Sequence, residues 1–222
     1  MLKQLFGKSG TIGGETRPTG TLHAVKISKY RKASLEWQVR NRLTWGYFSG
    51  WMFNGMAKVF SHLTGIPTLT STLRLVYINA LGQEIDYGIV SRRVVTTAGV
   101  NFLVDDWDDD SEDITLMNFH GSGTGITAAV IGDTGVETEL TTELDPNSTR
   151  PTGVKTQPSA NIIQSVGTAT YDGAAAVTEH GLMDQASTAG GSLWDRHVFA
   201  AINVVATDSI QITYQCTVNS GG

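Results

Sequence analysis

The strongest constraint on this fold lies near the C-terminus, where apolar and polar residues alternate over ten consecutive positions, 209–218. The apolar members of this run are Ile210, Ile212, Tyr214, Cys216 and Val218. Because successive side chains of a β-strand point to opposite faces, the run predicts a strand with one buried and one solvent-facing side.

Two segments ahead of this strand carry the same kind of pattern. Alternation from Trp194 to Asn203 predicts a second strand, and the run Ala174–Met183 predicts a third, separated from the second by a turn at Gly190-Gly191. The link Val204–Asp208 is short and ends in turn-forming residues, so we expect the last two strands to pair as an antiparallel hairpin. Together the three strands predict the closing sheet of a β domain.

Further elements are expected between Thr68 and Tyr171. A hairpin is predicted from Leu73–Asn79 and Ile85–Val95, followed by strands at Val100–Val104, Ile114–Phe119 and Ala160–Tyr171, with residues 133–159 mostly loop around a short helix at Val136–Leu144. The fold class that results is mainly β. We expect a β-sandwich, jelly-roll-like, spanning residues 67–222.

Residues 1–66 read differently and are expected to form a separate docking and assembly region. Residues 1–22 are rich in glycine, and residues 1–45 are therefore expected to be an extended basic arm that orders only on assembly. Large apolar residues from Tyr47 to Leu63 recur at three- and four-residue steps and predict one amphipathic helix. We expect its apolar face to pack on the protein's own core; a subunit-contact face and a membrane-surface helix are the alternatives.

Charge is distributed unevenly along the 222 residues, whose formal net charge is −5. Residues 1–45 carry a net charge of +7, and residues 101–222 carry −14. Such polarity can orient a subunit on an acidic surface. Contact with nucleic acid is the less favoured reading, although Tyr30, Trp37 and Trp45 lie among the basic residues.

Two segments resemble ligand-binding loops in composition but lack the residue spacing that such loops require. The run Asp105–Asp113 holds seven carboxylates, but it lacks the alternation and glycine of a calcium-binding loop. A solvated acidic loop is expected there, with a divalent-cation site as the alternative. The glycines of Gly121–Gly125 lack the lysine of a phosphate-binding loop. They are expected to lie in a loop between strands that needs positive φ angles.

Histidines and the cysteine give no catalytic signature either. The five histidines show no metal-ligand spacing; they are His23, His62, His120, His180 and His197. Glu179-His180 and Asp195-Arg196-His197 place acids next to histidines, but neighbouring strand residues face opposite ways, so neither is expected to form a dyad. The single cysteine, Cys216, is expected to be a small buried apolar side chain. We therefore expect no enzyme, no catalytic residue, no metal and no cofactor.

Targeting signals are not expected. The chain has no run of 18 apolar residues and no apolar segment like a signal peptide at its N-terminus, so it is expected to stay in the compartment where it is made, without a membrane partner.

Several motifs from Leu73 onward resemble a family of tailed-bacteriophage virion proteins. They are Ile85–Val100, Phe119–Gly125, Gly132–Thr134, Thr138–Leu140, Thr178–Leu182, Leu193–Phe199 and Ala201–Asn203. The resemblance implies an oligomeric virion β domain, with a trimer favoured, assembled in the host cytoplasm. We expect a cement or decoration protein on the head shell, with the major capsid protein or other virion subunits as partners. A tail component (adaptor, baseplate or fibre-base subunit) is the alternative, and a glycan-cleaving tail enzyme is the remote one.

Overall fold

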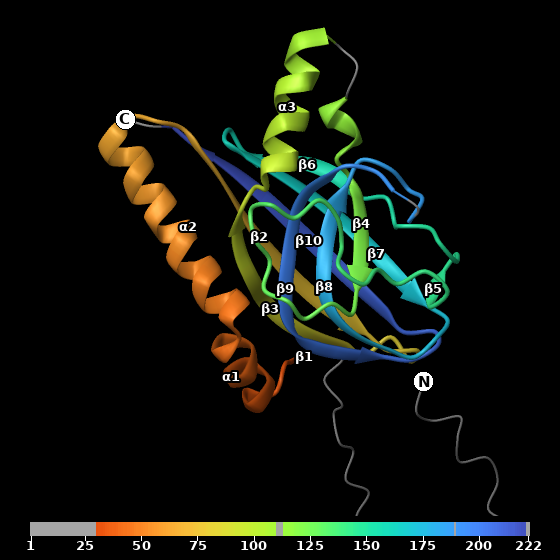
Figure 1. The fold of residues 1–222 in the computed structure, drawn as a ribbon. Helices are drawn as coiled ribbons and strands as arrows, with labels where there is room; N and C mark the ends of the chain where they lie inside the picture. The colour runs from red at the N-terminus through yellow and green to blue at the C-terminus, as the bar shows by residue number, and fades with distance from the viewer. Residues whose placement is uncertain (1–29, 110–112, 189, 221–222) are drawn as a thin grey trace, which may run out of the picture.

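Two β-sheets face each other in this protein; two helices line one side of the sandwich, and a third projects from one end (Figure 1). The computed structural model describes residues 30–109, 113–188 and 190–220. The larger sheet has the order β1-β3-β2-β10-β7-β5, with β6 also paired to β7, and the smaller has the order β4-β8-β9. The predicted mainly β sandwich is confirmed.

Strands of the larger sheet are β1 (Tyr30–Lys32), β2 (Thr68–Ile78), β3 (Glu84–Val94), β5 (Leu144–Asp145), β6 (Val154–Ser159), β7 (Ile162–Tyr171) and β10 (Ser209–Asn219). Those of the smaller sheet are β4 (Phe119–Gly123), β8 (Ala175–Met183) and β9 (Leu193–Val204). The helices are α1 (Leu35–Leu43), α2 (Trp45–Thr64) and α3 (Thr97–Asp109), with a 3-10 turn η1 (Ile114–Leu116).

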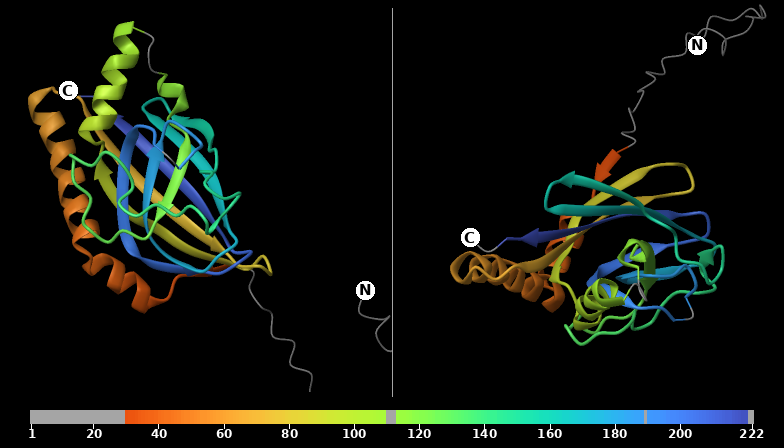
Figure 2. Two further views of the ribbon diagram at one scale, coloured as in Figure 1. Left: turned by 45° about the vertical axis from the view of Figure 1, so that its right-hand side comes forward. Right: turned by 90° about the horizontal axis from the view of Figure 1, so that it is seen from above.

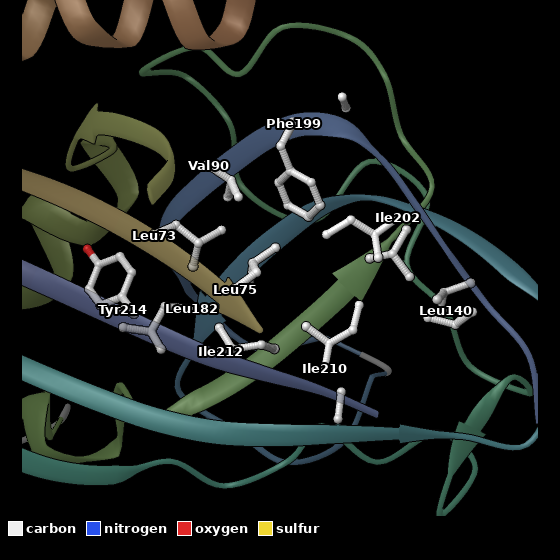
Figure 3. Packing of buried hydrophobic residues seen from close by; sticks show 14 of the residues in the cluster. Leu73, Leu75, Val90, Leu140, Leu182, Phe199, Ile202, Ile210, Ile212 and Tyr214 are labelled. Carbon is white, nitrogen blue, oxygen red and sulfur yellow. The ribbon is translucent and has the colours of Figure 1, made fainter. Parts of the chain in front are cut away.

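The core lies between the two sheets, and β10 contributes to it as the alternation predicts (Figure 3). Ile210, Ile212 and Tyr214 are almost fully buried, and they face Leu182 and Ile202 of the other sheet. Each such aliphatic side chain stabilises the fold by roughly 1.5–3 kcal/mol through the apolar surface it removes from water.

The expected hairpin between the last two strands is wrong. β9 pairs with β8 in the smaller sheet, whereas β10 pairs with β2 and β7 in the larger one. The turn before β10 therefore carries the chain from one sheet to the other. Buried Asp208 holds this corner, since its carboxylate accepts hydrogen bonds from the Val205 N–H (2.9 Å) and the Tyr77 hydroxyl (2.8 Å). Local turn chemistry marks the corner but does not say which sheet the next strand joins.

The hairpin of β2 and β3 is confirmed, but the strand expected at Val100–Val104 is wrong because this segment lies in α3. The Thr96 hydroxyl accepts the Gly99 N–H at 3.1 Å and caps the start of this helix. The segment expected as a strand from Ile114 begins with η1, and pairing begins only at Phe119.

The short helix expected at Val136–Leu144 is also wrong, since this segment forms turns and the short strand β5. The N–H groups of Glu137 and Thr138, which a helix start would leave free, donate instead to the buried carboxylate of Glu179. The Glu179 carboxylate, which is distant in sequence, thus fixes these N–H groups in a turn and not in a helix.

Helix α1 packs on the body of the sandwich. Trp37 belongs to the core and donates its indole N–H to the carbonyl oxygen of Ala201 at 2.9 Å. The expectation that residues 1–45 order only on assembly therefore does not hold for α1. Residues 1–29 of the expected arm lie outside the described residues.

Candidate functional site

Helix α2 covers the side of the sandwich where β3 has an edge, and it does so with small and polar residues. β1 pairs with β3 only at residues 84–86, which leaves the later part of the edge to the helices (Figure 2). The Asn54 amide donates to the carbonyl oxygen of Arg93 at 3.1 Å. A Cβ at Gly50 would overlap the carbonyl oxygen of Arg92, so only glycine allows this close approach.

The large apolar side chains of α2 consequently point away from the protein. Trp51 is 59 % exposed and Leu63 is 77 % exposed. The other exposed apolar residues of the helix are Phe48, Phe53, Met56, Val59 and Phe60. The expectation that this face packs on its own core is wrong, because the β3 edge presents carbonyl oxygens that need polar partners. An exposed apolar face of this size marks an interaction surface.

A groove of about 740 Å³ runs along this outward face. Its apolar lining includes Trp51, Met56, Val59, Phe60 and Leu63. Lys58 and Arg92 also line it, and α2 contains no acidic residue. Gly55 lies in the groove with open space above it, because a Cβ placed there would meet no atom within 4 Å.

A second exposed apolar face lies on α3, whose C-terminal end includes the start of the expected acidic loop. Residues Asp105–Asp109 are helical, so the loop expectation is wrong for them. Val100, Val104 and Trp107 are exposed, and Trp107 is 84 % so. Beyond the helix, Asp113 accepts the Thr115 N–H at 2.8 Å, and hydrogen bonds from Thr115 lower the pKa of this carboxyl.

The cation alternative for the acidic run finds no candidate in the described part of the chain, where no three His, Cys, Asp or Glu side chains are grouped to hold a metal. Residues 110–112 of the run lie outside that part.

Three of the five histidines meet in the core, although their spacing in the sequence gives no hint of it. His120 Nδ1 lies 3.0 Å from His180 Nε2, and the rings of His180 and His197 lie 6.1 Å apart. On its other side His120 contacts the Ser165 hydroxyl at 2.9 Å. Burial lowers the pKa of His120 to about 3, and burial together with the two neighbouring imidazoles lowers that of His180. His120 and His180 are therefore neutral structural groups at pH 7.

Asp195 and His197 share a face of β9, so the expectation that they point apart is wrong: residues two apart in a strand lie on the same side. Asp195 Oδ2 lies 3.2 Å from His197 Nε2, and Ser71 contacts both side chains. A catalytic triad needs the serine on one imidazole nitrogen and the carboxylate on the other. Here both meet the same nitrogen, and all three side chains are at most 1 % exposed. The group therefore joins the two sheets and does not form a hydrolytic site.

Glu179 lies on the outer face of the smaller sheet and anchors the segment that covers it. Its carboxylate pairs with Arg196 at 2.7 Å and accepts backbone N–H groups of Gly125, Glu137 and Thr138. The neighbouring His180 points to the core, as the expectation of opposite faces requires.

The glycine stretch reaches this same region, and its expected role is wrong. Gly121 and Gly123 lie in β4, and none of the stretch's glycines has a positive φ. A Cβ at Gly123 would lie 2.6 Å from the Thr138 carbonyl oxygen, so these glycines permit close packing.

The basic region around α1 borders a cavity that also has aromatic residues in its lining. Arg31, Lys32 and Arg40 line a cavity of about 560 Å³ together with Tyr77 and Tyr87. Trp37, an expected base-stacking residue, is buried. The side chains of Tyr30 and Trp45, and His23 altogether, lie outside the described set, whereas His62 is exposed on α2.

Cys216 is buried as expected. Burial, and to a lesser extent the negative charge of nearby Asp195, raises the pKa of its thiol to about 12.

Comparison of the chain with family models, with curated proteins and with solved structures finds no match. No helix in the described ranges is long and apolar enough to cross a membrane.

The outward face of α2 is thus the feature that most directly indicates function. The sequence carries a signal for it: Gly50, Asn54 and Ser61 recur on one side of the helix and are all buried. In this helix the small and polar stripe is the packed side, because β3 presents backbone carbonyl oxygens to it.

Proposed function

We propose that this chain is a structural subunit of a tailed-bacteriophage virion, a cement or decoration protein that stabilises the head shell. The observation that carries the proposal is the exposed apolar face of α2. Covering such a face in an assembly removes apolar surface from water at about 25 cal/mol per Å². The resemblance of the strand motifs to virion proteins and the basic N-terminal region support the same assignment.

Particle labelling tests this proposal. Antibody-gold labelling of purified particles, with the copy number measured against the major capsid protein by quantitative mass spectrometry, should show many copies spread over the head. Particles that lack the chain would overturn the proposal.

A tail component is the second candidate, and one observation favours it. The chain presents two separate exposed apolar faces, on α2 and on α3, which suits a subunit with a neighbour on each side in a ring. Gold label confined to one vertex or to the tail, with few copies per particle, would favour this candidate over a head protein.

The arm provides a separate test of the docking role expected for residues 1–45. Deleting residues 1–20 should leave the β domain folded and soluble but lower its occupancy on particles. Normal attachment of the truncated chain would contradict that role.

A further inference from the structure

We propose that the chain associates with further copies of itself by docking α3 of one copy into the groove along α2 of the next. This inference rests on the assembly role proposed above and names the occupant of the α2 groove. The two surfaces lie on different parts of the molecule, since α2 runs along the side of the sandwich and α3 projects from one end (Figures 1 and 2).

The shape of α3 suits a groove. Val100, Val104 and Trp107 follow the spacing i, i+4, i+7 and therefore form one stripe along the helix. Amphipathic helices bind hydrophobic grooves by placing apolar side chains at this spacing into them. Trp107 is the residue with the most surface to bury, and the open space over Gly55 offers a place for a large ring.

Charge distinguishes a second copy from other occupants. Helix α3 carries Asp105, Asp106, Asp108 and Asp109 and no basic residue. The groove has the opposite sign, because Lys58 and Arg92 line it and α2 has no acid. By contrast, residues 1–29 carry five basic residues and one acid, so this segment has the same sign as the groove.

The position of the acids strengthens the argument. They lie at the C-terminal end of α3, where the helix dipole is negative and disfavours further negative charge. Cations from a neighbouring groove would relieve this repulsion. The end of α3 is therefore stabilised by the partner that the groove provides.

The contact is heterologous, because each copy contributes a different surface. Repeating such a contact gives a closed ring or an open filament, depending on the rotation between neighbours.

Two single variants and their mixture test this arrangement on the full chain. Trp107→Glu spoils α3 and leaves the groove intact, whereas Gly55→Glu fills the groove and leaves α3 intact. Both positions are exposed, so the fold is retained. In sedimentation velocity over a concentration series, the native chain should form oligomers. Each variant should weaken association at least roughly thirtyfold, the effect of losing one hot-spot contact, because one removes the Trp107 ring and the other blocks its seat.

Mixing the two variants gives the decisive result. Each retains the surface that the other has lost, so an equimolar mixture should form a heterodimer that grows no further. Leu81→Glu is the matched control, since Leu81 is 83 % exposed in the β2–β3 turn and should leave assembly unchanged.

Other occupants appear as other outcomes. A monomeric native chain would overturn the proposal, whether its α2 face binds anionic vesicles or is covered by residues 1–29. Assembly that needs Gly55 but tolerates Trp107→Glu would overturn it in favour of α2 pairing with itself. A chain found on particles but monomeric in solution defeats this inference alone, and one that self-assembles but is absent from particles defeats only the virion role.

Discussion

The side-chain oxygen of Asn41 accepts the backbone N–H of Ala200 at 2.8 Å, and through this contact α1 reaches the edge of the smaller sheet. The amide of the same side chain donates to the carbonyl oxygen of Val90 in the larger sheet at 2.9 Å. Asn41 is 2 % exposed, so water cannot replace either bond. One asparagine thus closes the side of the sandwich by satisfying an edge group of each sheet.

Replacing Asn41 by alanine should destabilise the protein by about 2–6 kcal/mol, because two buried backbone groups lose their partners at about 1–3 kcal/mol each. Urea unfolding followed by tryptophan fluorescence measures the change. Arg42→Ala, on the exposed side of the same helix, is the control and should shift stability by no more than about 0.5 kcal/mol. Equal effects of the two substitutions would mean that Asn41 does not join the sheets.

The two glycines of α2 should respond to alanine in opposite directions. Gly50→Ala should lower stability by roughly 1–3 kcal/mol, because the new methyl group overlaps the Arg92 carbonyl and forces α2 away from β3. Gly55→Ala should raise stability by up to about 1 kcal/mol, because Gly55 is exposed and alanine favours the helix. Thermal unfolding of both variants measures this; two shifts of the same sign would contradict the packing described for α2.

Local patterns predicted β2, β3, β7, β8, β9 and β10, because a two-residue period follows from one buried face, but they missed β1, β4, β5 and β6. They failed where contacts with residues distant in sequence determine the pairing of a strand or the orientation of a helix. The strand after the Asp208 corner could not be assigned to a sheet, since both sheets offer an apolar inner face. Helix α2 was recognised, but its orientation was not, because the carbonyl groups of β3 that attract Asn54 belong to a strand distant in sequence.

Acid should destabilise this protein through its buried histidines. In the unfolded chain a histidine binds a proton near about pH 6.5. In the folded chain the pKa of His120 is about 3, and that of His180 is lowered in the same direction. Between these values the unfolded state binds more protons, so stability is present above about pH 6.5 and is lost as the pH falls, by up to about 1.4 kcal/mol per unit for each histidine.

Urea midpoints measured from pH 7 down to about pH 5 test this, above the range in which most carboxylates titrate. His120→Gln should remove one histidine's share of the slope, whereas His62→Gln, on the exposed face of α2, should leave the slope as it is. An unchanged slope in His120→Gln would show that His120 is not held neutral by the core.

The buried histidines and their polar neighbours show why this cluster could not be predicted from the sequence. Residues 120, 180 and 197 come from three strands, and only the pairing of β4, β8 and β9 brings them together. The pair Asp195 and His197 could have been found, since a two-residue separation in a strand places both on one face. Their shared contact with Ser71 could not, because Ser71 belongs to the other sheet.

The glycines of β4 provide a final prediction, which separates close packing from turn formation. Gly123→Ala should cost about 1–3 kcal/mol, because the added methyl group meets the Thr138 carbonyl oxygen and the Glu179 carboxylate. Gly135→Ala is the matched control: it lies in the segment over the same sheet, meets no atom within 4 Å, and should change stability by no more than about 0.5 kcal/mol. Hydrogen exchange adds a local measurement, since the Thr138 amide donates to Glu179 and should lose protection in Gly123→Ala only. If Gly123→Ala kept both its stability and this protection, close packing against the Thr138 segment would not require glycine at this position.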